Sequence, residues 1–239
     1  MRAVILAGGK GTRLRPFTTL IPKPLVPLGG RCSILEIVLM QLAQSGFTHV
    51  TLAVNHLANL IMAYFGDGSR WGLQLDYSLE SKPLSTIAPL TLIKDLPDKF
   101  LVMNGDILCD LDYRAFYQEH EARGSDVTVS AFRREVNIDF GVLEYDAKQQ
   151  LIGFREKPTY TFDVSMGIYC ISRNIIDRLP IGEPYGFDTL MLDGIEKGDK
   201  IWIRPFSGYW LDIGRPDDYQ YADENFDFLI DRLHIGIPS

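Results

Sequence analysis

The chain has 239 residues, of which 46% are hydrophobic and 23% charged, so it can bury a large core and lacks the composition of a disordered segment. Its net charge of −7 argues against general binding to nucleic acid or to an anionic membrane surface, because both need an excess of Lys and Arg. No apolar run approaches the roughly 20 residues that span a bilayer, and Met1-Arg2 leads into a strand rather than a secretory signal, so we expect a cytoplasmic protein with no membrane partner.

A short apolar run, Val4 to Ala7, opens the chain and ends in a glycine-rich loop. Such a run is typical of a strand buried on both faces of a sheet. Glycines lack a Cβ, so their backbone can adopt a positive φ and bring its amides close to a ligand, as a concave nest for anionic oxygens. Because cationic side chains follow at once, the stretch predicts a cradle for a polyphosphate. The glycines and the cations are Gly8, Gly9, Gly11, Lys10, Arg13, Arg15 and Lys23.

Two other glycine-loop motifs do not fit this stretch. The dinucleotide fingerprint needs a third glycine where Leu14 stands, and the P-loop needs Gly-Lys-Ser/Thr after a four-residue spacer, which is absent.

After this loop, strand and helix patterns alternate along the chain. The apolar spacing from Ile34 to Leu42 predicts a helix that stops at Gly46. Strands are predicted at Val50–Val54 and Leu73–Leu79, with a helix at Leu57–Phe65 between them. The alternation predicts a mainly parallel sheet with right-handed crossovers.

A further buried strand, Phe100–Met103, ends in Asn104, Gly105 and Asp106. A carboxylate at the C-terminal end of a central parallel strand lies at the ligand-binding edge of an open α/β sheet, so Asp106 is a candidate metal ligand. Asp112 is better explained as the cap of the helix that follows it.

The second half of the chain carries antiparallel patterns. Val127–Phe132 reads as a strand, and Phe140–Tyr145 with Leu151–Phe154 predicts a hairpin across a polar turn. Such pieces late in an α/β chain predict a second, small antiparallel sheet that covers the pocket and holds the second substrate. Helices are predicted at Arg173–Leu179, Phe187–Glu196 and Pro216–Leu233.

Several separated motifs together resemble those of the sugar-1-phosphate nucleotidyltransferases, or NDP-sugar pyrophosphorylases. Members of that family open with Leu-Ala-Gly-Gly-x-Gly-Thr-Arg-Leu, which is residues 6–14 here, followed by Pro-Lys-Pro, residues 22–24. The family's Glu-Lys-Pro element stands at Glu156–Pro158, and its Trp-x-Asp-x-Gly-x-Pro motif at Trp210–Pro216. Since the motifs keep the family's order, the resemblance covers nearly the whole chain.

The resemblance implies an α/β fold, with a Rossmann-like mixed, mainly parallel sheet flanked by helices and a smaller antiparallel sheet over the sugar pocket. We expect one domain, residues 1–239, with a nucleotide-binding part at about 1–110 and a sugar-phosphate-binding part at about 111–239. The implied reaction joins an NTP to a sugar 1-phosphate and releases pyrophosphate, with Mg²⁺ as cofactor. The Glu-x-x-Pro-Leu loop, residues 80–84, is more similar to that of relatives that transfer a guanylyl group onto a mannose- or heptose-type 1-phosphate, so we expect that reaction. A homo-oligomer stays open, because relatives are often dimers or larger.

The resemblance also implies roles for individual residues. The catalytic residues are Arg13, Lys23 and Asp106. The nucleotide-binding residues are Leu6, Ala7, Gly8, Gly9, Gly11, Thr12, Arg13, Lys23, Glu80, Pro83, Leu84, Ser85, Thr86 and Gly105. The sugar-phosphate-binding residues are Asn104, Gly141, Glu156, Lys157 and Ser165. The Mg²⁺ ligands are Asp106 and Asp212.

The chain departs from the family's pattern at three positions. Ser85 and Ala88 replace two glycines of the nucleotide loop, and Ser165 replaces an asparagine. A side chain in the left-handed region costs on the order of 1 kcal/mol. We expect an ordinary φ at Ser85 and Ala88, because Ser and Ala are the least bulky replacements.

If that expectation fails, nucleotide binding would be weakened, which motivates a second hypothesis: a nucleotide- or sugar-phosphate-binding regulator of the same fold without turnover. A glycosyltransferase is not favoured, because the Asp-x-Asp at Asp110–Asp112 follows Asn-Gly-Asp, the better metal-site candidate.

Overall fold

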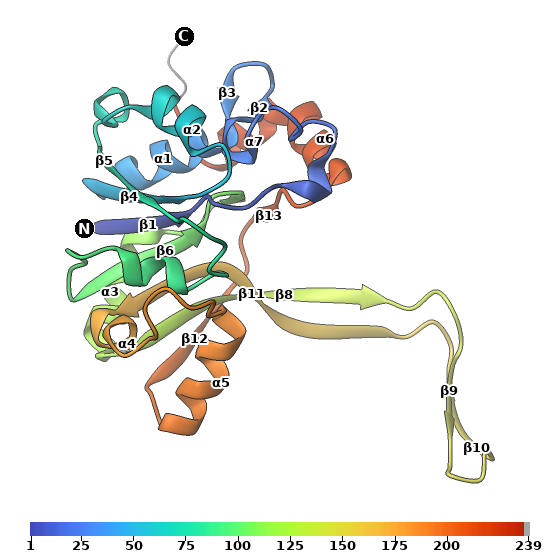
Figure 1. The fold of residues 1–239 in the computed structure, drawn as a ribbon. Helices are drawn as coiled ribbons and strands as arrows, with labels where there is room; N and C mark the ends of the chain where they lie inside the picture. The colour runs from blue at the N-terminus through green and yellow to red at the C-terminus, as the bar shows by residue number, and fades with distance from the viewer. Residues whose placement is uncertain (237–239) are drawn as a thin grey trace.

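The computed structural model describes residues 1–236, so the last three residues of the predicted domain, 237–239, lie outside the described residues. It contains a large sheet with helices on both faces and a long two-stranded arm that projects from it (Figure 1). The strands are β1 (Arg2–Leu6), β2 (Pro27–Leu28), β3 (Cys32–Ser33), β4 (His49–Val54), β5 (Gln74–Leu79), β6 (Lys99–Asn104), β7 (Ile107–Cys109), β8 (Val127–Asn137), β9 (Val142–Tyr145), β10 (Leu151–Arg155), β11 (Thr159–Ser172), β12 (Ile201–Phe206) and β13 (Trp210–Asp212). The α-helices are α1 (Ile34–Gln44), α2 (Ala58–Phe65), α3 (Tyr113–Arg123), α4 (Arg173–Asp177), α5 (Phe187–Lys197), α6 (Pro216–Glu224) and α7 (Phe226–Arg232).

The central sheet has seven strands in the order β12-β8-β11-β6-β1-β4-β5. Strand β11 is antiparallel to both of its neighbours, β6 and β8, and the other paired neighbours are parallel. The predicted mixed, mainly parallel sheet is confirmed. Six strands therefore end at the same edge, where the loops after β1, β4, β5 and β6 meet.

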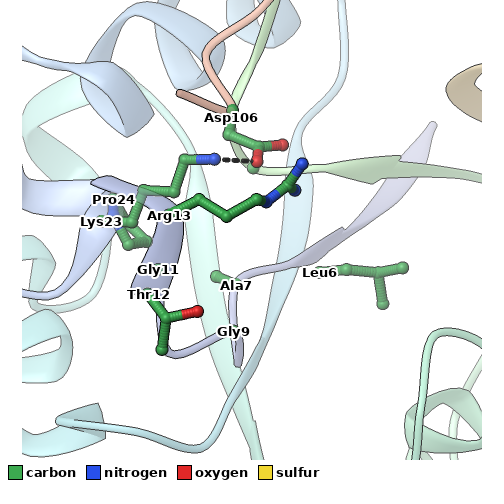
Figure 2. A pocket seen from close by; sticks show the side chains of 11 residues that line it. Leu6, Ala7, Gly9, Gly11, Thr12, Arg13, Lys23, Pro24 and Asp106 are labelled. Atoms are coloured by element: carbon green, nitrogen blue, oxygen red, sulfur yellow. Dashed lines mark hydrogen bonds and ion pairs between the residues drawn. The ribbon is translucent and has the colours of Figure 1, made fainter. Parts of the chain in front are cut away.

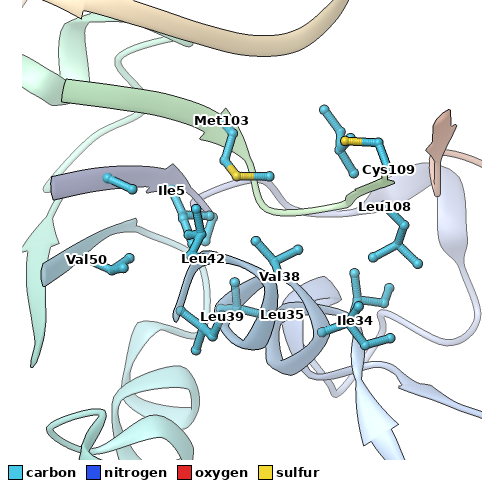
Figure 3. Close-up of a cluster of buried hydrophobic side chains, with 14 of the residues drawn as sticks. Ile5, Ile34, Leu35, Val38, Leu39, Leu42, Val50, Met103, Leu108 and Cys109 are labelled. Atoms are coloured by element: carbon cyan, nitrogen blue, oxygen red, sulfur yellow. The ribbon is translucent and has the colours of Figure 1, made fainter. Parts of the chain in front are cut away.

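Alternate side chains of each central strand pack into two different cores. Ala3 and Ile5 of β1 face a core shared with α1, α2, α3, α6 and α7, whereas Val4 faces a second core shared with α4 and α5. This is the two-residue period of a strand buried on both faces, and it gives a three-layer arrangement. Figure 3 shows the first core, where Leu35, Val38 and Leu42 of α1 pack under the strands.

Helix starts follow the local capping chemistry. Ser33 caps α1 by accepting from the Glu36 amide, while the Glu36 carboxylate accepts from the Ser33 amide. The cap predicted for Asp112 is confirmed, because its carboxylate accepts from the Ala115 amide at 2.9 Å. The predicted helix from Pro216 to Leu233 is instead two helices, α6 and α7, which meet at Asn225.

The predicted hairpin exists as β9 and β10, but its position differs from the expectation. Strand β8 does not stop at Phe132; it continues to Asn137 and pairs with the start of β11, from Val164 to Thr159. This ribbon carries the hairpin away from the central sheet, so the small antiparallel sheet stands at the end of the arm (Figure 1). The predicted small antiparallel sheet is thus confirmed, and no residue of β9 or β10 lines the cavities described below.

In residues 1–236, no helix combines the length and the apolar character needed to cross a bilayer.

A buried histidine predicts how stability depends on pH. His120 is 0% exposed and contacts Thr128 Oγ1 at 2.8 Å and Ser172 Oγ at 3.3 Å. Burial, helped by the charge of Lys99, lowers the pKa of His120 to about 4. The unfolded chain, whose histidine titrates near its ordinary pKa of about 6.5, then binds the extra proton first as the pH falls. Between pH 7 and pH 5 we expect wild type to lose about 2 kcal/mol more of its free energy of unfolding than His120→Gln does.

Urea unfolding of both proteins at the two pH values measures this difference. Equal losses in the two proteins would contradict the role of His120.

Candidate active site

Three adjoining cavities form one groove at the C-terminal edge of the sheet. The first, of about 240 Å³, lies over the glycine loop, and the second, of about 500 Å³, extends toward the loop after β5. The third lies between Phe132, Trp210 and Arg215, at the base of the arm. Arg13 lines all three cavities, so a ligand in any of them meets its charge.

The structure brings together all fourteen residues predicted to bind nucleotide. Each lines the first or the second cavity, and Asn104 and Asp106 line the second cavity with them. Those lining the first are Leu6, Ala7, Gly9, Gly11, Thr12, Arg13, Lys23 and Gly105. Those lining the second include Leu6, Gly8, Gly9, Arg13, Glu80, Pro83, Leu84, Ser85 and Thr86.

The glycines of the first loop serve different purposes. Only Gly11 has a positive φ, of 60°, and its carbonyl accepts from the Thr18 hydroxyl at 2.7 Å. At Gly8 a Cβ would lie 2.9 Å from Glu80 Oε1, so the need there is for space rather than for a left-handed backbone. Around Gly9 a Cβ would meet nothing within 4 Å, which leaves this backbone open toward the cavity. The expectation of positive φ is thus met at one glycine of three.

Two cations and a carboxylate meet beside this loop. Figure 2 shows Lys23 and Arg13 pointing toward Asp106, and the Lys23 ammonium forms an ion pair with the Asp106 carboxylate. Lys23 follows Pro22 at the start of a short 3-10 helix, Lys23–Leu25, whose Pro24 is buried, so its backbone is held firmly. Its side chain is only 12% exposed, which strengthens its electrostatic effect on a bound anion.

The two predicted metal ligands lie side by side although 106 residues separate them. Strand β13 pairs antiparallel with β7, placing Asp212 opposite Ile107, and the Ile213 amide donates to the Asp106 carbonyl at 3.0 Å. Asp212 lines the third cavity, but protein atoms surround much of its carboxyl group and exclude water from it. That desolvation raises the pKa of Asp212, and the negative charge of Asp106 raises it further. Two repelling carboxylates at a phosphate-sized cavity fit a divalent cation, which would relieve the repulsion.

Glu80 organises the loop that closes the second cavity. Burial raises the pKa of Glu80, while its carboxylate accepts from the Leu84 amide at 3.2 Å. Through this hydrogen bond the Glu80 side chain holds residues 81–84 against the end of β5. Asn55 donates to the Glu80 carbonyl at 3.4 Å and lines the same cavity.

Ser85 adopts the left-handed backbone that its replacement of glycine put in question. Its φ is 69°, so the expectation of an ordinary φ was wrong at this position. Ala88, by contrast, begins a 3-10 helix, Ala88–Leu92, is buried and has no positive φ, so the expectation holds there. The departure at Ser85 therefore carries backbone strain at the rim of the cavity, and the one at Ala88 does not.

The strain at Ser85 predicts a stabilising substitution. Ser85→Gly removes a left-handed side chain, so the free energy of unfolding should rise by about 1 kcal/mol, less the entropy that glycine adds to the unfolded chain. Ala88→Gly is the matched control: it should destabilise the protein by about 1 kcal/mol, because it puts glycine into a helical position and removes a buried methyl group. Urea titration of the three proteins measures both changes. A Ser85→Gly protein that is less stable than wild type would contradict the argument.

The predicted sugar-phosphate residues are divided between two places. Asn104 lines the second cavity, at the end of β6. Gly141, Glu156 and Lys157 belong to the β9–β10 hairpin and its flanks and line none of the three cavities. Ser165 lies where the arm joins the sheet, with its hydroxyl between Tyr169 OH at 3.1 Å and the Gly167 amide at 3.3 Å.

Some residues that line the cavities were not predicted from the sequence. Asn55 stands directly after β4, and the rule that singled out Asp106, a polar residue at the C-terminal end of a strand, would have found it. Arg134, Arg215 and Asp218 line the third cavity, and no local pattern marks them, because they meet only through the packing of β8 against the loop after β13.

Comparison with known proteins shows the family of this chain. The model of the family described as Nucleotidyl transferase matches residues 2–227. This chain belongs to that family. It is 35% identical over 226 residues to a mannose-1-phosphate guanylyltransferase of Mycobacterium tuberculosis, covering 91% of this chain and 62% of that relative. It is 33% identical over 242 residues to a UTP–glucose-1-phosphate uridylyltransferase of Synechocystis, covering 93% and 62%.

Among solved structures, HddC from Yersinia pseudotuberculosis, crystallised with GMP-PN, aligns with a TM-score of 0.72 and 29% identity, over 94% of this chain and 99% of that one. The names of these relatives confirm the predicted resemblance to sugar-1-phosphate nucleotidyltransferases. The chain spans about 62% of the length of the curated relatives described here.

Proposed function

We propose that this nucleotidyltransferase chain joins an NTP to a sugar 1-phosphate, giving an NDP-sugar and pyrophosphate. The observation that carries the proposal is the meeting of a glycine loop, two cations and two carboxylates at one edge of the sheet, in a chain matched by the family model from residue 2 to residue 227. Each of these groups suits one need of phosphoryl chemistry.

The reaction needs no general base from the protein to activate the nucleophile. The sugar phosphate is already ionised at neutral pH, so one of its oxygens can attack the α-phosphorus directly. A P–O bond forms there while the bond to the β-phosphate oxygen breaks, and pyrophosphate leaves with the electron pair. The difficulty is to bring two anions into line, which is a task of positioning and charge neutralisation.

We assign this task to the residues of the groove. The amides of the glycine loop and Arg13 bind the β- and γ-phosphates, and Lys23 neutralises the α-phosphate, where charge grows as the new bond forms. Asp106 and Asp212 hold Mg²⁺, an ion that accepts one or two carboxylates together with substrate phosphates. When bound, the ion supplies charge neutralisation and polarises the phosphate oxygens.

The two halves of the chain divide the substrates. Residues 1–110 bind the nucleotide, with the base and ribose against residues 80–86. Residues 111–239 bind the sugar phosphate, with Lys157 on its phosphate and Glu156, Gly141 and Ser165 toward the sugar hydroxyls. Asn104, at the end of β6 in the nucleotide-binding part, also faces the sugar. A carboxylate next to an ammonium suits a ligand that has hydroxyl groups at one end and a phosphate at the other.

The preferred substrates are GTP and a mannose- or heptose-type 1-phosphate. We infer this substrate preference from the Glu-x-x-Pro-Leu loop. It is supported by the relative named as a mannose-1-phosphate guanylyltransferase and by the HddC structure crystallised with GMP-PN.

A single panel tests the function. Purified protein with Mg²⁺ is given each of four NTPs with several hexose and heptose 1-phosphates, and pyrophosphate release is measured against samples that lack the sugar. We expect release that depends on both substrates and is fastest with GTP. Nucleotide binding without release in any combination would overturn the proposal in favour of the regulator hypothesis.

A further inference from the structure

The arm comprises residues 133–164: the outer parts of β8 and β11, and the hairpin β9–β10 beyond them (Figure 1). Its ribbon is two strands wide, with Arg133 opposite Asp163 and Asn137 opposite Thr159. Strand β8 runs in the same direction as β1 and β6, so the arm leaves the sheet at the edge where the groove opens. It then points away from that groove.

The arm exposes far more apolar surface than a two-stranded ribbon can shelter. Phe140 is 77% exposed, Ile152 68% and Tyr145 66%. A two-stranded hairpin is marginally stable in water unless its apolar side packs against another element. Contiguous exposed apolar surface of this kind marks an interaction site. The large hydrophobic side chains of the arm that are more than half exposed are Phe140, Leu143, Tyr145, Leu151, Ile152, Phe154 and Phe162.

The arm also keeps three of the proposed sugar-phosphate residues, Gly141, Glu156 and Lys157, together but away from the groove of their own chain. A Cβ at Gly141 would lie 2.6 Å from the Phe154 ring and 3.3 Å from Glu156 Oε2, so these residues meet where the hairpin begins. Lys157, next along the chain, is exposed and has a φ of 41°, a backbone conformation that residues other than glycine adopt uncommonly. None of these three residues lines the cavities of the groove in their own chain.

The charges of the arm argue for a partner like itself. The arm carries five basic and six acidic residues, so it offers neither the basic excess that nucleic acid or an anionic membrane needs nor a strongly acidic face. A second copy of the chain offers both missing parts: an apolar arm to bury these side chains, and an open groove that lacks Lys157 and Glu156. In a two-fold symmetric dimer the same contact occurs twice, so each copy has its arm buried and its groove completed by the other copy.

We propose that two copies of this chain exchange their arms, so that each groove is completed in trans by Gly141, Glu156 and Lys157 of the other copy. This inference rests on the proposed function for the role of these residues, but the exchange itself does not depend on it. The nucleotide-binding half and the sugar-phosphate cluster that act together then belong to different copies.

Complementation between inactive variants tests the exchange. Asp106→Asn damages the groove and Lys157→Ala damages the arm, and we expect each variant alone to be inactive. When the two are co-expressed, the mixed dimer has one doubly altered site and one wild-type site, so the mixture should recover about one quarter of the wild-type rate of pyrophosphate release. If the arm served its own chain, every site would carry one lesion and no activity would return.

The matched control co-expresses Asp106→Asn with Lys23→Ala. Both lesions lie in the groove, so no mixed dimer has an intact site and no recovery is expected. The proposal would be overturned if wild type is active but the Asp106→Asn and Lys157→Ala mixture recovers no activity. It would also be overturned if Lys157→Ala alone is active.

Sedimentation equilibrium tests the exchange independently of activity. Wild type should have the mass of a dimer, and a variant with residues 138–158 replaced by Asn-Gly should be a folded monomer. A monomeric wild type would overturn the exchange even if pyrophosphate release is observed, whereas a dimer without pyrophosphate release would overturn the proposed function alone.

Discussion

Asp106→Asn should lower the turnover of pyrophosphate release by about 10²–10³-fold while the protein stays folded. The substitution keeps the size of the side chain but removes one of the two adjacent carboxylates and the ion-pair partner of Lys23. The main-chain carbonyl that accepts from the Ile213 amide is unchanged. Because the charge of Asp106 raises the pKa of Asp212, its loss also relieves a repulsion, which offsets the lost ion pair with Lys23.

Steady-state rates and urea unfolding, measured on the same preparation, separate the two effects. The matched control is Asp98→Asn, an exposed carboxylate at the opposite end of β6, which should change neither quantity. A variant at position 106 that works at the wild-type rate would remove Asp106 from the catalytic site.

Lys23→Ala should lower turnover by about a hundredfold or more, with a smaller loss of nucleotide affinity. The ammonium is nearly buried and lies beside the first cavity, where its charge is screened little by water. We expect it to act most strongly on charge that grows at the α-phosphate during the reaction. The loss should therefore fall more on kcat than on KM.

Lys94→Ala, which removes an exposed ammonium, is the control for a general change in charge. If Lys23→Ala raised KM alone and left kcat intact, Lys23 would bind the ground state of the nucleotide and would not stabilise the transition state.

Local sequence patterns predicted β1, β4, β5, β6 and the start of β8, but not the edge strand β12. The apolar runs that became β1, β4 and β6, and the helical spacing of α1, reflect burial that neighbouring residues alone dictate. Asp106 could be singled out because the end of a buried strand is a local signal. Asp212 could not: its place beside Asp106 depends on the pairing of β13 with β7 across the fold, and only the resemblance to a known family indicated it.

The errors arose where longer-range contacts decide the outcome. Ser85 has its φ of 69° in a loop that contacts a distant part of the chain, since the Tyr185 amide donates to the Leu84 carbonyl at 3.0 Å. The size of the serine side chain alone gave no sign of this. The hairpin was recognised, but its position depended on how far β8 and β11 pair beyond the sheet. Residues 133–137 are Arg-Arg-Glu-Val-Asn, a mostly polar run without the alternation that marks a strand, although they pair with β11. Nothing in that local pattern marks where the pairing ends.

The place of β11 in the sheet has a consequence for biosynthesis. Strand β11 lies between β8 and β6, so it inserts into the middle of the sheet after both neighbours have left the ribosome. Until residue 172 emerges, β6 presents a free hydrogen-bonding edge, which is a template for aggregation. A nascent chain stalled before residue 159, or a fragment of the first 110 residues, therefore leaves this edge of β6 unpaired, and we expect it to aggregate more readily than the full chain.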